Sequence, residues 1–272
     1  MADRLGWIKQ VPQRWLHWAP QRGGLQGHAA LRARYPDAEC LLAGPRSTAT
    51  AQQLAELSGP RWLPTPWRRT QRLQVWDGAV SGEVDMLWAN MALHEDAYPK
   101  RTLRAWKEAL KVNGFLMFSC LGPDSLKELR AVHQHMGWPS PTHTLTDMHD
   151  LGDMLVEVGF AEPVMDMERI TLTYATVDRL IQDLRDWGRN LSAQRFAGCR
   201  SRNWLARWKE ALQTHLPRNS EGQFLLTFEV VYGHALRPVP RVKVQANAAL
   251  SEEDMRRMLR AGVTHPRNPR GA

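Results

Sequence analysis

The chain has few cysteines and no long apolar run. Its 272 residues include three cysteines, Cys40, Cys120 and Cys199, which lie far apart and outside any C-x-x-C spacing. This number and spacing predict neither a disulfide framework nor a zinc site, and we expect buried, unreactive thiols. No segment approaches the roughly 18 consecutive apolar residues of a membrane-spanning helix, and the N-terminus lacks the apolar stretch of a signal peptide. The sequence therefore predicts a cytoplasmic protein that does not span a membrane.

The sequence also lacks a recognisable metal-binding motif. Histidine and aspartate side chains are frequent between positions 133 and 153, at His133, His135, His143, Asp147, His149, Asp150 and Asp153. They are spread across a Pro-rich stretch and do not form an H-x-x-x-H or H-E-x-x-H frame. We therefore interpret them as solvated or helix-capping side chains and predict no metal site.

The net charge of +8 is concentrated in two segments. Residues 238–272 carry seven Lys or Arg and three Asp or Glu, in a stretch rich in Pro, Ala, Asn and Arg. Such a composition predicts a flexible basic tail outside a folded domain of residues 1–237. Residues 185–209, here called the basic segment, carry seven basic residues against Asp186 alone. The segment would suit nucleic acid, an acidic protein or only solvent, and nucleic acid is the weakest of the three because no RNA-binding consensus is present.

Short apolar runs alternate with helical patterns over the first 160 residues. Strands are predicted at residues 14–19, 38–44, 73–76, 84–89 and 115–120. Helices are predicted at residues 25–35, at residues 51–57, from Pro99 to the Asn113-Gly114 pair, from the capping-box pair Ser125 and Glu128, and over residues 148–158 with Gly159 as the stop. This order predicts a largely parallel sheet that is covered by helices on both faces.

The pattern changes after residue 160. Apolar residues alternate at positions 170, 172 and 174 and again over residues 224–232, which predicts two antiparallel strands near a sheet edge. Two helices lie between these strands, and their buried stripes are expected to include Trp187, Trp204 and Trp208. The chain is thus predicted to form a doubly wound, Rossmann-like α/β domain with an antiparallel last strand pair and a helical insertion at about residues 176–220.

The stretch after residue 89 is a candidate ligand-binding loop. In open α/β sheets, ligands bind beyond the carboxyl ends of the strands, at the point where the strand order reverses. Asn90, Met91, Leu93 and His94 follow the apolar run of residues 84–89, where a bend would let a flat cofactor ring lie against the backbone. The HED triplet at residues 94–96 is either an acid-base group at this crevice or the start of the next helix.

Four segments resemble a known family. They are "DMLWANMALH", "LKVNGFLMFSCLGPDSLKELR", "MHDLGDMLVEVGFAEPVMDMERITLTY" and "FEVVYGHA", which lie between residues 85 and 235. They are similar to the S-adenosylmethionine-dependent methyltransferases of biotin synthesis, the malonyl-acyl-carrier-protein O-methyltransferases. The resemblance implies a class I methyltransferase fold of seven strands and S-adenosylmethionine as cofactor. It also implies methyl transfer to the free carboxylate of a malonyl thioester on an acidic acyl carrier protein, a partner that the basic segment would suit.

The N-terminal part departs from the family pattern. Such enzymes resemble one another in an acid-x-Gly-x-Gly-x-Gly loop after strand one and in an acidic residue that ends strand two. The corresponding loop here is "WLHWAPQRGGL", with His17 and Trp18 in place of the acidic start, and residues 43–45 provide no carboxylate for the ribose. The cofactor-binding residues implied by the resemblance and by the crevice loop are Gly23, Gly24, Asn90, Met91, Leu93 and His94.

The chemistry sets few demands on side chains. A carboxylate that attacks a sulfonium methyl group needs no general base, so no catalytic triad is expected. A malonyl substrate does require a cation near its carboxylate, preferably an arginine. Arg130, Arg185 and Arg189 are candidates because they lie near predicted helix ends, and for each of them a solvated surface position is the alternative.

Two functions of different classes stay open at this stage. The first is an active methyltransferase whose diverged cofactor loop works through backbone contacts and Trp15 or Trp18. The second is a non-catalytic protein that keeps the methyltransferase fold, has lost cofactor binding and acts as a binding or regulatory protein. The segments after residue 85 favour the first function, and the altered Gly-rich loop favours the second.

Overall fold

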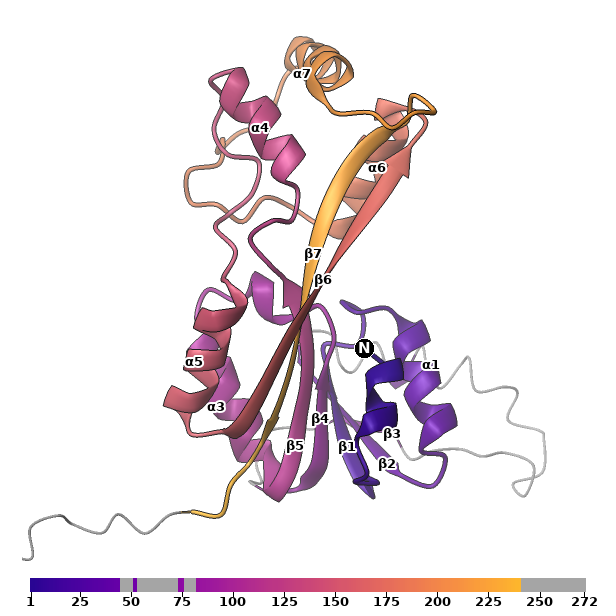
Figure 1. Ribbon diagram of the computed structural model, residues 1–272, viewed down its shortest axis with the longest axis vertical. Coiled ribbons are helices and arrows are strands. Elements are labelled where there is room, and N and C mark those ends of the chain that lie inside the picture. Colours follow the sequence, from indigo (N-terminus) through magenta and orange to yellow (C-terminus); the bar gives the residue numbers. More distant parts are fainter. Residues whose placement is uncertain (45–50, 53–72, 76–81, 241–272) are drawn as a thin grey trace, which may run out of the picture. The chain divides into compact units, whose positions relative to one another are not determined.

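Seven strands form one sheet at the centre of the molecule. The computed structural model describes residues 1–44, 51–52, 73–75 and 82–240, and Met1–Val239 form one compact unit. The strands are β1 (Arg14–Trp18), β2 (Glu39–Ala43), β3 (Leu73–Val75), β4 (Val84–Ala89), β5 (Leu110–Leu121), β6 (Ala161–Tyr174) and β7 (Phe224–Leu236). Their order in the sheet is β3-β2-β1-β4-β5-β7-β6 (Figure 1). The first five strands pair in parallel, and β7 is antiparallel to both of its neighbours, so the predicted fold class is confirmed.

Helices cover both faces of the parallel part of this sheet. The helices are α1 (Leu25–Arg34), α3 (Pro99–Ala109), α4 (Lys127–His135), α5 (Met148–Val158), α6 (Val177–Trp187) and α7 (Arg202–His215), with short 3-10 turns η1 (Asp3–Trp7) and η3 (Leu93–Glu95). On β4, Leu87 is buried in a cluster with residues of α3 and α5, whereas Met86 and Trp88 are buried in a cluster with residues of η1 and α1. Alternate side chains of one strand thus enter two different cores, which explains the continuous apolar run that predicted it.

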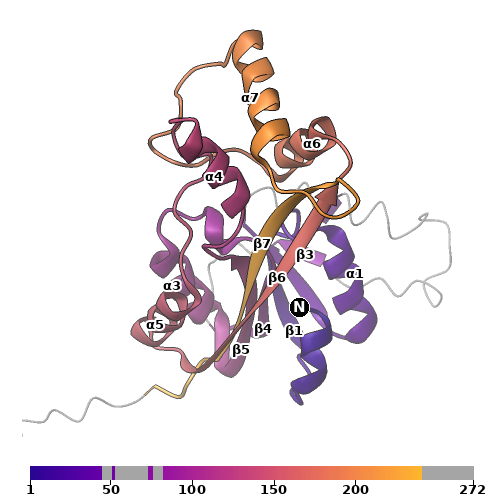
Figure 2. The ribbon, with the colours of Figure 1, turned by 45° about the horizontal axis from the view of Figure 1, so that its top comes forward.

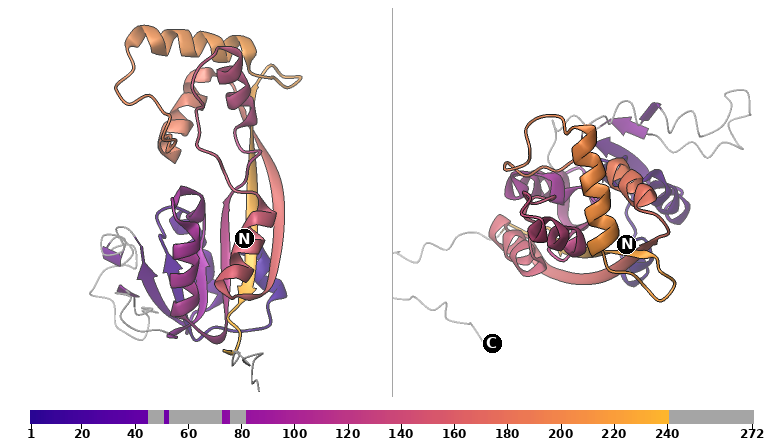
Figure 3. Two further views of the ribbon diagram at one scale, coloured as in Figure 1. Left: turned by 90° about the vertical axis from the view of Figure 1, so that its left-hand side faces the viewer. Right: turned by 90° about the horizontal axis from the view of Figure 1, so that it is seen from above.

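A third core joins the far ends of β6 and β7 to helices α4, α6 and α7. It includes Leu129 of α4, Leu180 of α6, Leu212 of α7 and Leu226 of β7, all buried. Figures 2 and 3 show the β6–β7 pair running from the parallel part of the sheet to these three helices. The helical insertion therefore packs on the extended antiparallel pair.

The structure corrects the predicted end of the helix at Pro99. Helix α3 ends at Ala109, and Leu110 already has an extended conformation as the first residue of β5. Asn113 lies within β5 with φ 65°, where its N–H donates to the carbonyl of Arg237 at 2.8 Å. The register between β4 and β5 shifts at this place. The Asn-Gly pair therefore forms an irregularity in the strand. In the sequence alone, such a pair looks the same as one that ends a helix.

The predicted capping box of Ser125 and Glu128 is also wrong. Helix α4 follows Leu126, which has φ 58° and caps the helix without a side-chain hydrogen bond. The Ser125 hydroxyl instead donates to the Glu229 carbonyl and accepts from the Glu229 N–H, both at 3.0 Å. The Glu128 carboxylate accepts from the Thr227 N–H at 2.9 Å and from the Thr227 hydroxyl. Ser125 and Glu128 thus connect the start of α4 to β7, which lies about 100 residues later in the chain. The spacing of neighbouring residues cannot predict such a contact.

Three tryptophans and one cysteine are less buried than predicted. The Trp187 side chain is 44% exposed, and Trp204 and Trp208 are half-buried. The last two rings stack at 5.5 Å between centroids, and the Trp208 Nε1–H donates to His133 Nε2 at 3.0 Å. These three tryptophans thus lie at the border of the third core, with their rings partly exposed to solvent. Cys40 and Cys120 are buried as expected, but Cys199 is exposed.

Some predictions fall on residues outside the described ranges. Of the predicted helix at residues 51–57, only positions 51 and 52 are described, and the predicted tail is described only to residue 240. Among the described helices, none has the length and apolar character needed to cross a membrane. The described residues also contain no group of three or more His, Cys, Asp or Glu side chains placed to hold a metal ion.

The contact between β5 and β7 leads to a stability prediction. Gly233 lies directly opposite Phe118, and a Cβ atom at position 233 would overlap the Phe118 ring. We expect Gly233→Ala to lower the free energy of unfolding by about 1–3 kcal/mol, measured by urea denaturation. The control is Gly27→Ala in α1, where a Cβ would meet no atom within 4 Å, and there we expect no loss or a gain of about 0.5–1 kcal/mol. Equal stability of the two variants would contradict the close packing.

Candidate functional site

Unusual backbone conformations gather at the carboxyl ends of three neighbouring strands. Ala19 after β1 has φ 46°, Gly44 after β2 has φ 92°, and Met91 after β4 has φ 52°. The Ala19 N–H donates to the Ala43 carbonyl at 2.8 Å, and a Cβ at position 44 would lie 3.1 Å from the Ala19 nitrogen. Such conformations are costly outside glycine and cluster at ligand-binding sites. They mark the edge where the strand order reverses between β1 and β4, which is the expected place for a ligand.

Asn90 joins the loops after β1 and β4 to strand β5. Its Nδ2 donates to the Gly23 carbonyl at 2.8 Å, and its Oδ1 accepts from the Ser119 hydroxyl at 2.5 Å. The Ser119 hydroxyl in turn accepts from the Met91 N–H at 3.1 Å. A Cβ at position 23 would overlap the Asn90 side chain, so only glycine allows this approach. The structure thus brings together Gly23, Asn90 and Met91, three of the predicted cofactor-binding residues.

A buried pair of histidines joins β1, near the position where the family pattern has an acid, to α1. The Nδ1 atoms of His17 on β1 and His28 on α1 are 3.1 Å apart, and the two side chains are almost fully buried. Burial and, to a smaller extent, the neighbouring His28 lower the pKa of His17 to about 3. Burial, with the charge of Arg32, lowers the pKa of His28 to about 4. Both imidazoles are therefore neutral at pH 7, with one Nδ1 donating and the other accepting.

The described residues fit an S-adenosylmethionine-type ligand through backbone and neutral groups. The sheet edge between β1 and β4 is bordered by the glycine loop and by the loop of Asn90 and Met91, which a hydrogen bond joins. The imidazoles of His17 and His28 are neutral and add no positive charge near the end of β1. Burial and the nearby His143 and Arg22 lower the pKa of His94 to about 4, so that this side chain is neutral as well. The end of β2 has no carboxylate at Ala43 or Gly44, so the ribose contact of the family pattern is not provided there.

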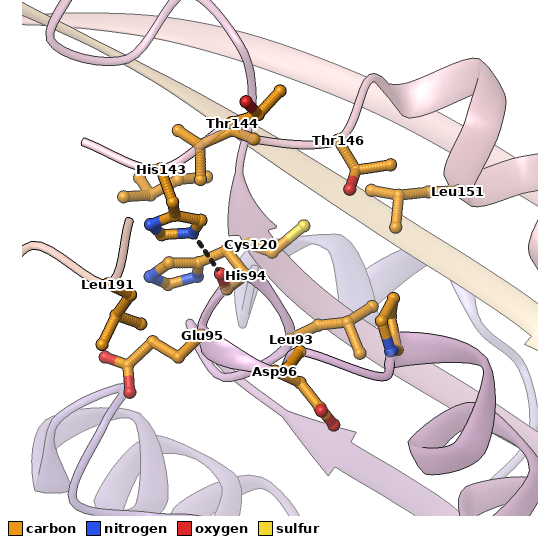
Figure 4. A pocket seen from close by; sticks show the side chains of 14 residues that line it. Leu93, His94, Glu95, Asp96, Cys120, His143, Thr144, Thr146, Leu151 and Leu191 are labelled. Carbon is orange, nitrogen blue, oxygen red and sulfur yellow. Dashed lines mark hydrogen bonds between the residues drawn. The ribbon is translucent and has the colours of Figure 1, made fainter. Parts of the chain in front are cut away.

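A cavity of about 330 Å³ lies beside the stretch that follows β4 (Figure 4). Its walls come from residues 93–97 and Pro99 around η3, from Cys120 and Leu121 at the end of β5, from residues 143–146, and from Leu151 and Leu191. The volume is within the range of about 300–1,000 Å³ that is typical of small-molecule sites. Among the residues that line this cavity, Leu93 and His94 were predicted from the sequence as ligand-binding residues. The residues that face them across the cavity were not predicted to bind a ligand.

Both acidic side chains that line the cavity are already paired. Glu95 forms an ion pair with Arg22, with Nη–Oε distances of 2.7 and 2.9 Å. Asp96 accepts from the Tyr98 N–H at 2.8 Å and from the Thr102 hydroxyl, so it stabilises the start of α3. Of the two interpretations of the HED triplet, the structure therefore supports the helix start for Asp96.

The two histidines of the cavity are linked by one hydrogen bond. Figure 4 shows the His143 ring above the His94 ring, and His143 Nε2 donates to the His94 carbonyl at 2.8 Å. The buried Nδ1 of His94 has no hydrogen-bond partner among the described residues. A buried ring nitrogen without a partner is costly, and a bound polar group would remove that cost.

The three arginines predicted to bind the substrate lie outside the lining of this cavity. The Arg130 guanidinium donates to the carbonyls of Ser125 and Pro123, and Arg185 and Arg189 are exposed on and just after α6. None of the three lines the cavity. No pattern in the sequence predicts a role for Arg22 or Ser119. The signals for them are weak: Arg22 directly precedes Gly23, and Ser119 is one polar residue inside the apolar run of β5.

Comparison with known proteins identifies the family. No protein-family model matches the chain. The malonyl-(acyl-carrier protein) O-methyltransferase of Nitrosospira multiformis is 36% identical over 261 residues, which cover 90% of this chain and 82% of the relative. The enzyme of the same name from Laribacter hongkongensis is 37% identical over 255 residues, covering 89% of this chain and 81% of the relative.

The chain belongs to the malonyl-(acyl-carrier protein) O-methyltransferase family. The family resemblance of the sequence is thereby confirmed, and the chain is a methyltransferase. Two solved structures support the fold alone. A methyltransferase-like protein of Bacillus halodurans matches with a TM-score of 0.54 at 14% identity, over 88% of this chain and 99% of its own. The YcgJ protein of Bacillus subtilis matches with a TM-score of 0.55 at 14% identity, over 87% of this chain and 97% of its own.

Proposed function

We propose that the protein transfers a methyl group from S-adenosylmethionine to the free carboxylate of a malonyl-acyl carrier protein, in cytoplasmic biotin synthesis. The observation that carries the proposal is the likeness, over about nine tenths of the chain, to enzymes named for this reaction. The clustering of strained backbone at the β1/β4 edge supports a ligand site in the place that the proposal requires.

The residues that we assign to the cofactor are Gly23, Gly24, Asn90, Met91, Leu93 and His94. When bound, the cofactor supplies a methyl group on a positively charged sulfur. The bond from the carboxylate oxygen to the methyl carbon forms as the carbon–sulfur bond breaks, the electron pair stays on sulfur, and no proton moves. The protein therefore has to hold oxygen, carbon and sulfur in line and exclude water, which neutral, tightly packed loops can do.

A calorimetric titration with S-adenosylmethionine and, separately, S-adenosylhomocysteine tests this function. We expect micromolar binding, followed by methyl transfer to malonyl-acyl carrier protein in a radiolabel assay. No heat and no thermal shift at millimolar concentrations of either compound would favour the alternative, a methyltransferase-fold protein that acts as a binding or regulatory protein. If the protein binds the cofactor but does not methylate this acceptor, the cofactor assignment stands and malonyl-acyl carrier protein is rejected as the substrate.

We further propose that the acyl carrier protein docks on the basic segment of residues 185–209. Arg185 and Arg189 are exposed there and are the candidates for contacting the acidic partner. The Arg200 guanidinium lies 3.9 Å from the centroid of the Phe196 ring, whose side chain is 52% exposed. Charged groups beside exposed apolar rings suit an acidic protein surface better than solvent alone.

Charge reversal tests this docking surface. We expect Arg185→Glu combined with Arg189→Glu to raise the KM for malonyl-acyl carrier protein at least about tenfold at low salt, with little change in kcat, because such charges steer encounter. Arg101→Glu combined with Arg104→Glu makes the same change of charge on the exposed surface of α3 and serves as the control. Equal KM values for the two double variants would contradict docking of the carrier protein on the basic segment.

A further inference from the structure

We infer that Glu229 on β7 is a positioning residue, which fixes the last residues of β5 at the ligand-binding edge of the sheet. It acts through the turn of residues 122–126, here called the β5–α4 turn, which directly follows β5. The inference rests on the proposed function and deepens it by naming the residue that holds the β5 side of the cofactor site.

The end of β5 extends beyond its neighbour β4. Strand β4 ends at Ala89, and residues 119–121 of β5 continue past it and pair with β7. Ser119 holds the loop of Asn90 and Met91, and the next two residues of β5 line the cavity. Among the described strands, β7 is therefore the one that supports this end of β5. The position of these side chains depends on β7 and on the turn that follows.

The β5–α4 turn is wrapped around Glu229. The Gly122 N–H donates to the Glu229 carbonyl at 2.8 Å, and the Asp124 N–H donates to the Glu229 carboxylate at 2.9 Å. The Ser125 hydroxyl donates to the same carbonyl and accepts from the Glu229 N–H. Four hydrogen bonds thus join three residues of the turn to one residue of β7. The contact with Asp124 is the one that the Glu229 side chain makes.

The space beside the Glu229 carboxylate is closely filled. A Cβ atom at position 122 would lie 2.7 Å from Glu229 Oε1 and 2.8 Å from its Cδ. Gly122 does not have a positive φ, so its backbone conformation does not call for glycine. The close approach of the turn to the carboxylate is therefore the reason that glycine suits this position.

Buried polar side chains are concentrated at this place. Of the seven among the described residues, four lie at the end of β5, in the β5–α4 turn and on the adjoining part of β7. They are Ser119, Ser125, Thr227 and Glu229. Burying a carboxylate is costly, and an apolar side chain at such a position is often no less stabilising. A buried polar network whose members are hydrogen-bonded fixes one arrangement of the chain. The role of Glu229 is therefore in geometry.

The cysteines of the chain provide a local measure of this geometry. Cys120 on β5 and Cys40 on β2 are buried, whereas Cys199 is exposed. In a Cys199→Ser background, N-ethylmaleimide therefore labels the two buried thiols when the protein opens. Global unfolding exposes both thiols, and a loosened β5–α4 turn exposes Cys120. The labelling ratio, defined as the rate at Cys120 divided by the rate at Cys40 and measured by peptide mass spectrometry, separates the two events.

Removal of the carboxylate tests whether it holds the turn. We expect Glu229→Leu to raise the labelling ratio at least about tenfold, because the Asp124 N–H loses its acceptor. Glu229→Gln keeps an oxygen acceptor for this N–H and should stay within about threefold of the parent protein. The control is Leu110→Ala, a fully buried position at the opposite end of β5. It lowers the stability of the whole domain and should leave the ratio within about threefold.

A glycine substitution keeps the test valid if Glu229→Leu does not fold. Gly122→Ala places a methyl group against the Glu229 carboxylate and should raise the labelling ratio at least about fivefold. Gly152→Ala in α5 is the matched control, because a Cβ there would lie 3.5 Å from Met165, which is an ordinary contact. An unchanged labelling ratio in both Glu229→Leu and Gly122→Ala overturns the inference.

Calorimetric titration with S-adenosylhomocysteine connects the turn to the cofactor site. We expect Glu229→Leu to raise the Kd about fivefold to tenfold, and Glu229→Gln to keep it within about twofold. Leu110→Ala should also keep the Kd of the parent protein within about twofold, so that a loss of stability alone does not account for the rise. An unchanged Kd in Glu229→Leu overturns the positioning role even if the turn is loosened.

Failure of this inference and failure of the proposed function give different results. If the parent protein binds S-adenosylhomocysteine and no variant alters the labelling ratio or the Kd, the methyltransferase function stands and Glu229 is not a positioning residue. If the parent protein does not bind this compound, the proposed function fails and the positioning role fails with it. A raised labelling ratio would in that case still show that Glu229 holds the β5–α4 turn.

Discussion

Asn90→Asp is expected to lower the affinity for S-adenosylhomocysteine by roughly 30-fold to 100-fold. The change is isosteric, but it replaces the Nδ2 donor to the Gly23 carbonyl with an oxygen that repels it. An aspartate also brings a negative charge into the partly buried contact between the two loops. Loss of a hydrogen bond together with an unpaired buried group costs about 2–3 kcal/mol, which corresponds to that range of affinity. Isothermal titration calorimetry at pH 7.5 measures the effect.

A matched change elsewhere controls for the added charge. Asn113→Asp makes the same substitution at an exposed position of β5 and should leave the affinity within twofold. Ser119→Ala removes the hydroxyl that contacts Asn90 Oδ1 and the Met91 N–H, and we expect an intermediate loss. If Asn90→Asp binds S-adenosylhomocysteine as tightly as the parent protein does, then the contact between the two loops is not needed for cofactor binding.

The strands and the position of the loop after β4 could be predicted because their determinants are local. Val84–Ala89 is apolar at almost every position, and both of its faces are buried, so its pattern identifies a strand without any knowledge of its neighbours. Asn90 and Met91 follow from that strand by the rule that ligands bind at carboxyl ends. This part of the site needs only the order of elements along the chain.

The parts that failed depend on pairings between distant residues. Ser125 and Glu128 have the spacing of a capping box, but their partners lie on β7, about 100 residues away. Ser119 looks like a minor interruption of an apolar run until Asn90 is placed beside it. Arg22 has only a weak signal, its place before Gly23, because its role depends on the ion pair with the distant Glu95. Such contacts become visible only when the topology is known.

Acid is expected to destabilise the protein through the His17–His28 pair. Their pKa values, about 3 and about 4 in the folded protein, lie below the value of about 6.5 in the unfolded chain. Between these values the unfolded chain binds more protons, so stability is fully present above about pH 7 and falls as the pH drops. Each histidine contributes about 1.4 kcal/mol per pH unit once the pH is well below 6.5. We expect the pair to account for about 3–4 kcal/mol of lost stability between pH 7 and pH 5.

Urea denaturation at pH 7, 6 and 5, followed by tryptophan fluorescence, measures this loss. The informative comparison is with the double variant His17→Leu and His28→Leu, in which both partners become apolar, so that no buried donor is left unpaired by the change. We expect this variant to lose about 3–4 kcal/mol less than the parent protein between pH 7 and pH 5. His135→Leu, which removes a histidine at an exposed position of α4, is the control for the loss of a histidine. If the parent and the double variant lose equal stability, the buried pair is not the acid-sensitive element. If the predicted difference is found, neutrality of the pair is a requirement of the fold where α1 packs on β1.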